Sequence, residues 1–194
     1  WFYDGQAFVV NTKKNSKVRK LADLNKAAIC VETGTTTERN LADYARANKL
    51  TFKPVVFEGQ EATEKAFQSG RCDAYTTDAS GLASVRNKEA SNPDDHLVLP
   101  ELISKEPLGP SVRRGDDEFF AIVKWVVFAL IEAEEYGITQ ANVDQLKGSS
   151  TDPVVQRILG TSEDTGKLLG LDKDWAYRAI KATGNYGEIF ERNV

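Results

Sequence analysis

The fold is decided by the stretch AICVETGTTTERNLADYA, which runs from Ala28 to Ala45. Its first four residues form an apolar run that is too short for a helix and is typical of a strand buried on both faces of a parallel sheet. After the turn at Gly34, Leu41 and Tyr44 recur at the three-to-four spacing of a helix with one buried face. The stretch therefore predicts a strand that leads directly into a helix.

The same alternation of strand and helix continues on both sides of this stretch. Strands are predicted over 8–10, 52–57, 72–76 and 97–99, with helical segments over 18–24, 60–68 and 79–89. Such alternation predicts βαβ units with right-handed crossovers and a parallel sheet between about residues 11 and 104. The segment 106–113 is extended and contains two prolines, so it is a natural crossing between two parts of the chain.

The chain changes character after residue 115 and becomes helical. Seven apolar positions between Phe119 and Ile131 predict a long amphipathic helix, with Asp116 or Asp117 as its N-cap and Gly137 after its end. Shorter helices are predicted over 140–146, 153–159 and 174–182. This half has too little strand to form a sheet of its own. We therefore infer that the long helix packs against a sheet supplied from elsewhere in a parent protein.

The composition argues against nucleic-acid binding and against insertion into a membrane. The 25 basic residues are scattered among 29 acidic ones, which argues against a nucleic-acid partner because phosphates require a clustered basic surface. The most apolar stretch, 121–133, is shorter than the ~20 residues of a membrane span, so no direct membrane insertion is expected. The chain contains no Met, and we expect a mature or truncated product from which any signal peptide has been removed.

The first candidate ligand site is the turn from Glu32 to Glu38. Gly34 allows close approach to the backbone, and the free amides at the start of the following helix suit a carboxylate or a phosphate. Thr35 and Glu38 also match a capping box. Taken alone, this turn is therefore better explained as an ordinary capped helix start.

The second candidate is Asp78, which lies at the end of the strand predicted to begin at Cys72. In a parallel sheet it would lie at the same edge as the Gly34 turn, about 6–10 Å from the helix amides as estimated from strand spacing. The alternative is a plain N-cap for the helix that starts at Ala79. Together, the two candidates predict a clamp for a zwitterion, with amides for its carboxylate and Asp78 for its ammonium.

Three segments also carry a resemblance to a known family. They are Cys-Val-Glu-Thr-Gly-Thr-Thr-Thr-Glu from Cys30, Ser-Gly-Arg-Cys-Asp-Ala-Tyr-Thr-Thr-Asp from Ser69, and Ile-Ser-Lys-Glu-Pro-Leu-Gly-Pro from Ile103. The chain resembles the periplasmic general L-amino-acid-binding proteins, within the polar-amino-acid receptors of ABC importers. The resemblance covers essentially all 194 residues.

The resemblance implies an α/β fold of the type II periplasmic-binding-protein class, with one complete parallel-sheet lobe and only the C-terminal helices of the other lobe. The implied boundaries are a first hinge strand at 1–10, the second ligand-binding lobe at 11–105, a second hinge strand at 106–114, and the helical part of the first lobe at 115–194. Members of the family normally have a further stretch before this point. That stretch builds the first-lobe sheet and supplies an Arg for the ligand carboxylate.

The resemblance also implies roles for individual residues. Thr36 would bind the ligand carboxylate beside Gly34, and Asp78 would bind the ammonium. Glu32, Thr35 and Thr77 would face the cleft and contact the ligand side chain. The implied ligand is an L-amino acid, with broad specificity, and the implied partner is the membrane permease of an ABC importer. The implied location is the periplasm.

Cys30 and Cys72 leave two alternatives, a disulfide in an oxidising compartment or two buried thiols. Both are expected on strands that lead into the two candidate turns, so a bridge is geometrically feasible. It would contribute about 3–4 kcal/mol by closing the intervening loop.

An enzymatic function finds little support in the sequence. His96 is the only histidine and is expected in a solvated turn, and no metal site or cofactor is expected. Trp125, Trp175 and the aromatic residues between 119 and 128 are expected in the core. Two alternatives remain open, namely a dehydratase on the same receptor fold, with Glu32 as its acid or base, and a sensory ligand-binding domain.

Overall fold

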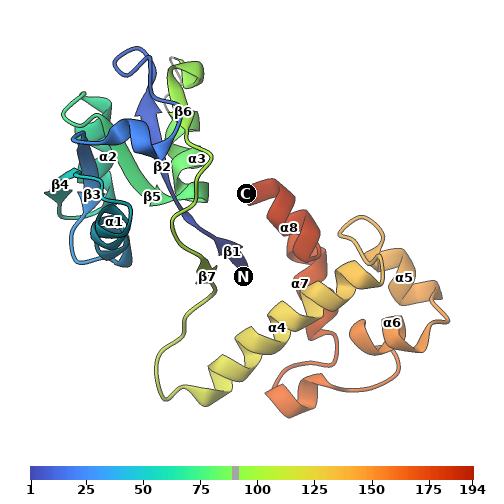
Figure 1. The fold of residues 1–194 in the computed structure, drawn as a ribbon. Coiled ribbons are helices and arrows are strands. Elements are labelled where there is room, and N and C mark those ends of the chain that lie inside the picture. Colours follow the sequence, from blue (N-terminus) through green and yellow to red (C-terminus); the bar gives the residue numbers. More distant parts are fainter. Residues whose placement is uncertain (89–91) are drawn as a thin grey trace. The chain divides into compact units, whose positions relative to one another are not determined.

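The computed structural model describes residues 1–88 and 92–194 (Figure 1). The chain divides into two compact units, one of residues Phe2–Gly109 and the other of Pro110–Val194 with Trp1. Each unit is described by itself below.

A five-stranded sheet forms the centre of the N-terminal unit. Its strands, in spatial order, are β4 (Lys53–Phe57), β3 (Ala28–Glu32), β5 (Ala74–Asp78), β2 (Gln6–Asn11) and β6 (His96–Val98). β3 runs parallel to β4 and β5, whereas β2 runs antiparallel to both β5 and β6. The expectation of a parallel sheet is therefore wrong at β2. An apolar run shows that a strand is buried on both faces but does not show its direction.

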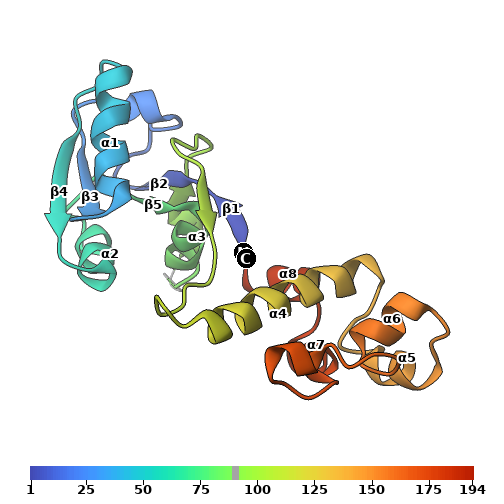
Figure 2. The ribbon, with the colours of Figure 1, turned by 90° about the horizontal axis from the view of Figure 1, so that it is seen from below.

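Helices cover both faces of this sheet (Figures 1 and 2). Alternate residues of β2 belong to two different hydrophobic clusters, with Phe8 and Val10 in one and Ala7 and Val9 in the other. The first cluster includes α1 (Thr36–Ala47) and the short 3-10 helix η1 (Leu21–Leu24), and the second includes α2 (Gln60–Gln68) and α3 (Ala79–Lys88). The result is a three-layer unit in which α1 and the α2/α3 pair lie on opposite faces.

Most predicted elements of this unit are present with small shifts at their ends. The strand predicted over 72–76 is β5, and Cys72 lies just before it rather than on it. The last residue of the helix predicted over 79–89 lies outside the described residues. His96 corrects another expectation, because it follows the short 3-10 helix η2 (Pro93–Asp95) at the start of β6 and is only 7% exposed. Its ring packs edge-on against Phe67, with the ring centroids 5.7 Å apart.

Two short strands, β1 (Phe2–Asp4) and β7 (Glu106–Leu108), form a separate antiparallel ribbon in the same unit. Asp4 pairs with Glu106 in this ribbon, so two carboxylates lie side by side at one end. The role of residues 1–10 and 106–114 as hinge strands stays a prediction.

The C-terminal unit is helical. It contains α4 (Asp117–Glu135), α5 (Val143–Ser149), α6 (Pro153–Ile158), the 3-10 helix η3 (Gly166–Leu169), α7 (Trp175–Thr183) and α8 (Tyr186–Asn193). Asp116 is the N-cap of α4 and accepts a hydrogen bond from the amide of Phe119 at 3.1 Å, as one of the two predicted alternatives requires. Helix α8 was not predicted from the sequence, although Asn185 and Glu188 form a capping box, which is a recognisable signal of a helix start.

Much of the apolar surface of α4 is exposed. Its Ala129 and Ala133 pack into the helical core, but Phe119, Phe120 and Trp125 each expose about half of their surface. Phe128 is 47% exposed and meets Trp125 edge to face. The expectation that these aromatic residues are core is therefore wrong within this chain, because only the alanine side of α4 faces the other helices.

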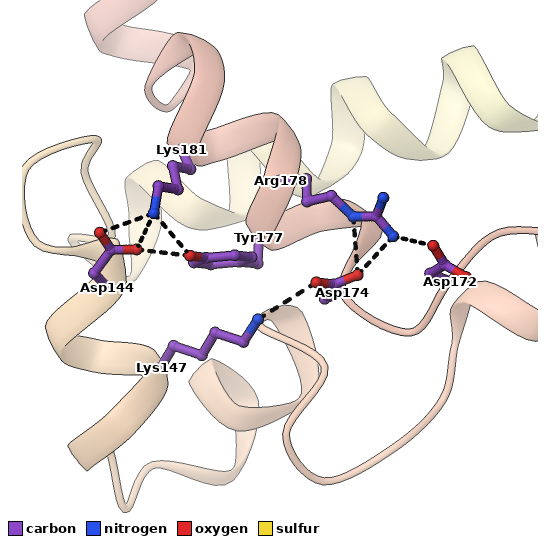
Figure 3. Close-up of polar contacts among 7 residues, drawn as sticks. All are labelled: Asp144, Lys147, Asp172, Asp174, Tyr177, Arg178 and Lys181. Atoms are coloured by element: carbon purple, nitrogen blue, oxygen red, sulfur yellow. Dashed lines mark hydrogen bonds and ion pairs between the residues drawn. The ribbon is translucent and has the colours of Figure 1, made fainter.

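A polar network joins α5 to α7 on the surface of this unit (Figure 3). The Tyr177 hydroxyl donates to Asp144 at 2.7 Å, and Lys181 pairs with the same carboxylate at 3.0 Å. The pKa of Asp144 is lowered, first by the Tyr177 hydrogen bond and then by Lys181. Lys147 lies over the Tyr177 ring, with its Nζ 3.5 Å from the centroid. Because the side chains of Lys181 and Asp144 are 53% and 63% exposed, their ion pair contributes little to the stability of the unit.

Candidate functional site

The two predicted site turns lie at one edge of the sheet. β3 and β5 are parallel neighbours, so both carry their carboxyl ends to the same edge. β3 ends at Glu32 and leads into α1, and β5 ends at Asp78 and leads into α3. This edge, beyond the carboxyl ends of parallel strands, is where open α/β sheets bind ligands.

The start of α1 presents free backbone amides. Gly34 has a φ of +75°, which turns the chain from β3 into the helix, and a side chain at this position would be strained. Thr35 is the N-cap, and its Oγ1 accepts a hydrogen bond from the Glu38 amide at 3.2 Å. The amides of Thr36 and Thr37 precede the first intrahelical hydrogen bond and have no acceptor inside the helix.

The capping box predicted for this turn is only half formed. Glu38 accepts a hydrogen bond from the Gly34 amide at 2.7 Å, whereas a capping box would engage the amide of Thr35. The Thr35 hydroxyl in turn donates to the Glu32 carbonyl at 2.8 Å. The turn is thus fixed from both sides, and the first helical amides are left for another acceptor.

Asp78 lies on the same face of the sheet as α1. Side chains alternate along β5, so Ala74, four residues before Asp78, points to the same face as Asp78. Ala74 belongs to the hydrophobic cluster under α1. Thr76 has the same orientation and is fully buried. The carboxylate of Asp78 and the positive end of α1 are therefore on one side of one sheet edge.

The Asp78 carboxylate lies in an electrostatically unfavourable environment. Partial burial raises its pKa, and the nearby carboxylates of Asp4 and Glu106 raise it further. The N-cap role considered for Asp78 is performed in part by Asp4, which accepts hydrogen bonds from the Ser80 amide at 3.2 Å and the Ser80 hydroxyl at 2.5 Å. A cation placed beside Asp78 would relieve both its desolvation and its repulsion from the two neighbours.

Gln6 is a residue of this region that the sequence reading missed. It is fully buried and lies opposite Asp78 in the β2–β5 pairing. Its Nε2 donates to the Thr37 carbonyl at 3.1 Å and to the Thr76 hydroxyl at 2.9 Å. A glutamine directly before the doubly buried run from Ala7 to Val10 is the signal that could have revealed it, because such a position otherwise favours an apolar residue.

Glu32 and Thr77 lie less favourably for contact with a ligand under α1. Both alternate with residues of the α1 face and have the same orientation as Cys30 and Tyr75, which belong to the α2/α3 cluster. Thr77 also packs near Gly81 of α3. Their proposed contact with the ligand side chain stays a prediction.

Cys30 and Cys72 form a disulfide, which settles the two alternatives left open by the sequence. Cys30 is fully buried and Cys72 is 2% exposed. The bridge connects β3 to the segment just before β5. The two strands that carry the candidate site are thus tied covalently as well as by pairing.

In residues 1–88 and 92–194, no three or more His, Cys, Asp or Glu side chains gather closely enough to hold a metal ion. No helix within these same ranges is long and apolar enough to cross a membrane.

Comparison with known proteins finds relatives that match the whole of this chain. No family model matches it. The general L-amino acid-binding periplasmic protein AapJ of Rhizobium johnstonii is 56% identical over 195 residues, which cover all of this chain and 56% of that protein. The glutamate/glutamine/aspartate/asparagine-binding protein BztA of Rhodobacter capsulatus is 52% identical over 193 residues, with the same coverage. YhdW of Escherichia coli K12, a putative amino-acid ABC transporter-binding protein, is 49% identical over 193 residues, which cover all of this chain and 56% of that protein. The whole of this chain is therefore similar to part of several amino-acid-binding proteins.

A solved periplasmic binding protein has the same fold as this chain. The periplasmic binding protein from Brucella ovis, solved with glutathione bound, is 56% identical and superposes with a TM-score of 0.93 over all of this chain and 60% of that one. The fold is therefore the type II periplasmic-binding-protein fold. The chain spans little more than half the length of the relatives that it matches.

Proposed function

We propose that the chain is part of a periplasmic receptor that binds L-amino acids and delivers them to the permease of an ABC importer. The observation that supports this most directly is the shared sheet edge, where the first turn of α1 and Asp78 lie on one face. The first offers amide donors and a positive dipole, and the second offers an unneutralised carboxylate. The α-ammonium and α-carboxylate of an amino acid match this pair in charge and order.

Thr36 and Asp78 are the proposed primary contacts. The Thr36 amide and hydroxyl would hold the carboxylate beside Gly34, and Asp78 would hold the ammonium. Thr35, Glu32 and Thr77 are proposed as secondary contacts to the ligand side chain. Binding would shift the receptor toward the conformation that the permease recognises, and no bond would be broken.

Glutathione is a second ligand candidate. The Brucella ovis relative was solved with glutathione bound. The γ-glutamyl group of glutathione carries a free α-ammonium and α-carboxylate, so it presents the same zwitterion as an amino acid, with a longer substituent. A site that binds through this head group would accept both, which agrees with broad specificity.

We also propose that the chain is not an enzyme. The matched relatives AapJ and BztA are named as binding proteins. The dehydratase alternative requires an acid or base beside the bond that breaks, and its candidate, Glu32, lies on the α2/α3 face, away from the proposed contacts of the ligand carboxylate and ammonium under α1. A sensory domain remains the alternative for which ligand binding would be the same and the partner different.

Calorimetric titration of the protein at the full length of its relatives tests the proposal. The panel contains L-amino acids, one D-enantiomer and glutathione, and each mixture is assayed for chemical change afterwards. We expect L-selective binding at micromolar concentrations or below, without turnover. Absence of binding across the panel would refute the receptor function, and conversion of a ligand would favour the enzymatic alternative.

Two variants locate the site. Asp78→Asn removes the countercharge of the ammonium, and we expect it to abolish tight binding. The matched control is Asp94→Asn, which removes one negative charge from the same unit at a carboxylate that is 90% exposed. Unchanged affinity in Asp78→Asn, or equal loss in both variants, would exclude Asp78 as the ammonium ligand.

A further inference from the structure

We propose that Gln6 is a positioning residue that sets the distance between the first turn of α1 and Asp78, and thereby selects α-amino acids over homologues with a wider separation of charges. The inference rests on the proposed function, because it assigns the specificity of the same site. It is carried by the two hydrogen bonds of a single buried amide.

Gln6 contacts both halves of the clamp. Its side chain donates to the carbonyl of Thr37, in the first turn of α1, directly after the proposed carboxylate ligand Thr36. Its backbone lies opposite Asp78 in the antiparallel pairing of β2 with β5. One residue therefore spans from the helix terminus to the strand that carries the ammonium ligand.

The β5 side of this connection is itself held in place. The Thr76 hydroxyl accepts the second hydrogen bond of Gln6 and donates to the Ala7 carbonyl at 2.7 Å. The Gln6 amide donates to the Ser104 hydroxyl at 3.1 Å, and its carbonyl accepts from the Ile103 amide at 2.9 Å. Because the backbone of Gln6 and the hydroxyl of Thr76 are both held by hydrogen bonds, the side chain of Gln6 has little freedom. Its bond to the Thr37 carbonyl therefore fixes the distance between the first turn of α1 and β5.

The side chain is costly where it lies. Its Oε1 is buried and has no hydrogen-bond partner among the described residues, although the residue is fully buried. A buried polar atom without a partner is unfavourable, and an apolar side chain of similar length would avoid that cost. The gain from the amide must therefore lie in the geometry that its two donated bonds impose.

This geometry has a chemical consequence. In an α-amino acid one carbon separates the ammonium from the carboxylate, and in a β-amino acid two carbons do. A clamp whose halves are held at one distance rejects the longer homologue, and a loosened clamp adapts to it. For comparison, hydrophobic pockets discriminate a single methylene by about 10–200-fold.

The test compares L-glutamine with its β-homologue, L-β-homoglutamine, by calorimetry on the full-length protein. The variant Gln6→Met has a similar length and lacks both donors. We expect it to weaken L-glutamine binding about tenfold, the loss that two ordinary hydrogen bonds can produce, and to weaken the β-homologue at most about twofold. The preference for the α-amino acid then falls several-fold. An equal loss for both ligands, or no loss for either, would overturn the proposal.

Control variants separate positioning from a loss of stability. Thr63→Val removes a fully buried hydroxyl that donates to the Gly59 carbonyl at 2.9 Å in α2, away from the site. It should lower stability without changing the preference. Thr76→Val should reproduce part of the effect of Gln6→Met, and Thr76→Ser, which retains the hydroxyl, should restore the preference.

A measurement without ligand distinguishes failure of this inference from failure of the proposed function. Hydrogen exchange of the amides in the first turns of α1 should be faster in Gln6→Met than in Thr63→Val, with other helices of the unit unchanged. If the unaltered protein binds no ligand of the whole amino-acid panel, the receptor function is refuted, and the exchange result still decides whether Gln6 holds α1 in place. Equal exchange in the two variants would exclude that role.

Discussion

Reduction of the Cys30–Cys72 disulfide should destabilise the N-terminal unit by about 4 kcal/mol. The two residues are 42 positions apart in the chain, and the loop-entropy relation gives this magnitude for a loop of that size. Both cysteines are buried, and reduction removes no atom from the core, so little of the change should come from lost packing. The reduced chain is therefore a direct measure of the constraint.

Urea titration of the oxidised and reduced chain provides the assay, with an internal reference. All three tryptophans, Trp1, Trp125 and Trp175, belong to the C-terminal unit, so their fluorescence reports that unit alone. Hydrogen exchange of β3 and β5 reports the N-terminal unit. With a typical slope of about 2 kcal/mol per molar urea, the N-terminal transition should move by about 2 M.

Two outcomes would refute this reasoning. A change below about 1 kcal/mol would mean that the unfolded chain is already compact around this loop or that the bridge is strained. An equal shift of the tryptophan transition would mean that the bridge does not act on the N-terminal unit alone. The double variant Cys30→Ala, Cys72→Ala should match the reduced protein within the small cost of two lost sulfur atoms.

Three further predictions follow from features of the site and of α4. Thr35→Ala removes the N-cap of α1 and should lower the free energy of unfolding by about 1 kcal/mol in chemical denaturation, and an unchanged value would contradict the cap. The pKa of Asp78 is raised in the folded state, so its stabilising contribution is present at low pH and is lost as pH rises through that pKa. At neutral pH Asp78→Asn should therefore stabilise the ligand-free protein, as thermal unfolding can test. Ligand affinity, measured by titration at decreasing pH, should fall at a higher pH than an ordinary aspartate would give, and a midpoint at or below the ordinary aspartate pKa would oppose this. Phe120→Ser, on the exposed side of α4, should reduce self-association of the 194-residue chain in sedimentation experiments. In the protein at the full length of its relatives, where we expect other segments to bury Phe120, the same substitution should lower the free energy of unfolding by about 3 kcal/mol. An unchanged free energy of unfolding would show that those segments do not bury Phe120.

Local sequence signals located most elements of the fold. The apolar run before Gly34, the spacing of Leu41 and Tyr44, and the acidic N-cap of α4 each act within a few residues, and each produced the element expected. The direction of β2 could not be predicted from the sequence, because a strand that is buried on both faces has the same apolar composition whether it runs parallel or antiparallel to its neighbours. His96 was predicted in a solvated turn because its neighbours in sequence are polar, and these neighbours do not reveal that Phe67 of α2 packs against its ring.

The candidate site divides in the same way. Thr35, Thr36 and Asp78 are marked by strand ends and turns, which are local patterns. Gln6 is not, because its partners, Thr37 and Thr76, come from distant segments that only the folded sheet brings together. The repulsion of Asp78 by Asp4 and Glu106 depends likewise on the β1–β7 ribbon.

The antiparallel placement of β2 also has a consequence for the order of folding. β2 is the first strand of its sheet in sequence, yet it pairs with the last two, so that Gln6 lies opposite Asp78 and Asn11 opposite His96. The centre of the sheet cannot close until nearly the whole unit is available, and such long-range pairing makes folding slow, on the order of milliseconds to seconds. During synthesis, the N-terminal unit should therefore remain unfolded until β6 has left the ribosome. Stopped-flow refolding of the whole chain would test this, and formation of β2–β6 contacts within the dead time of mixing would exclude it.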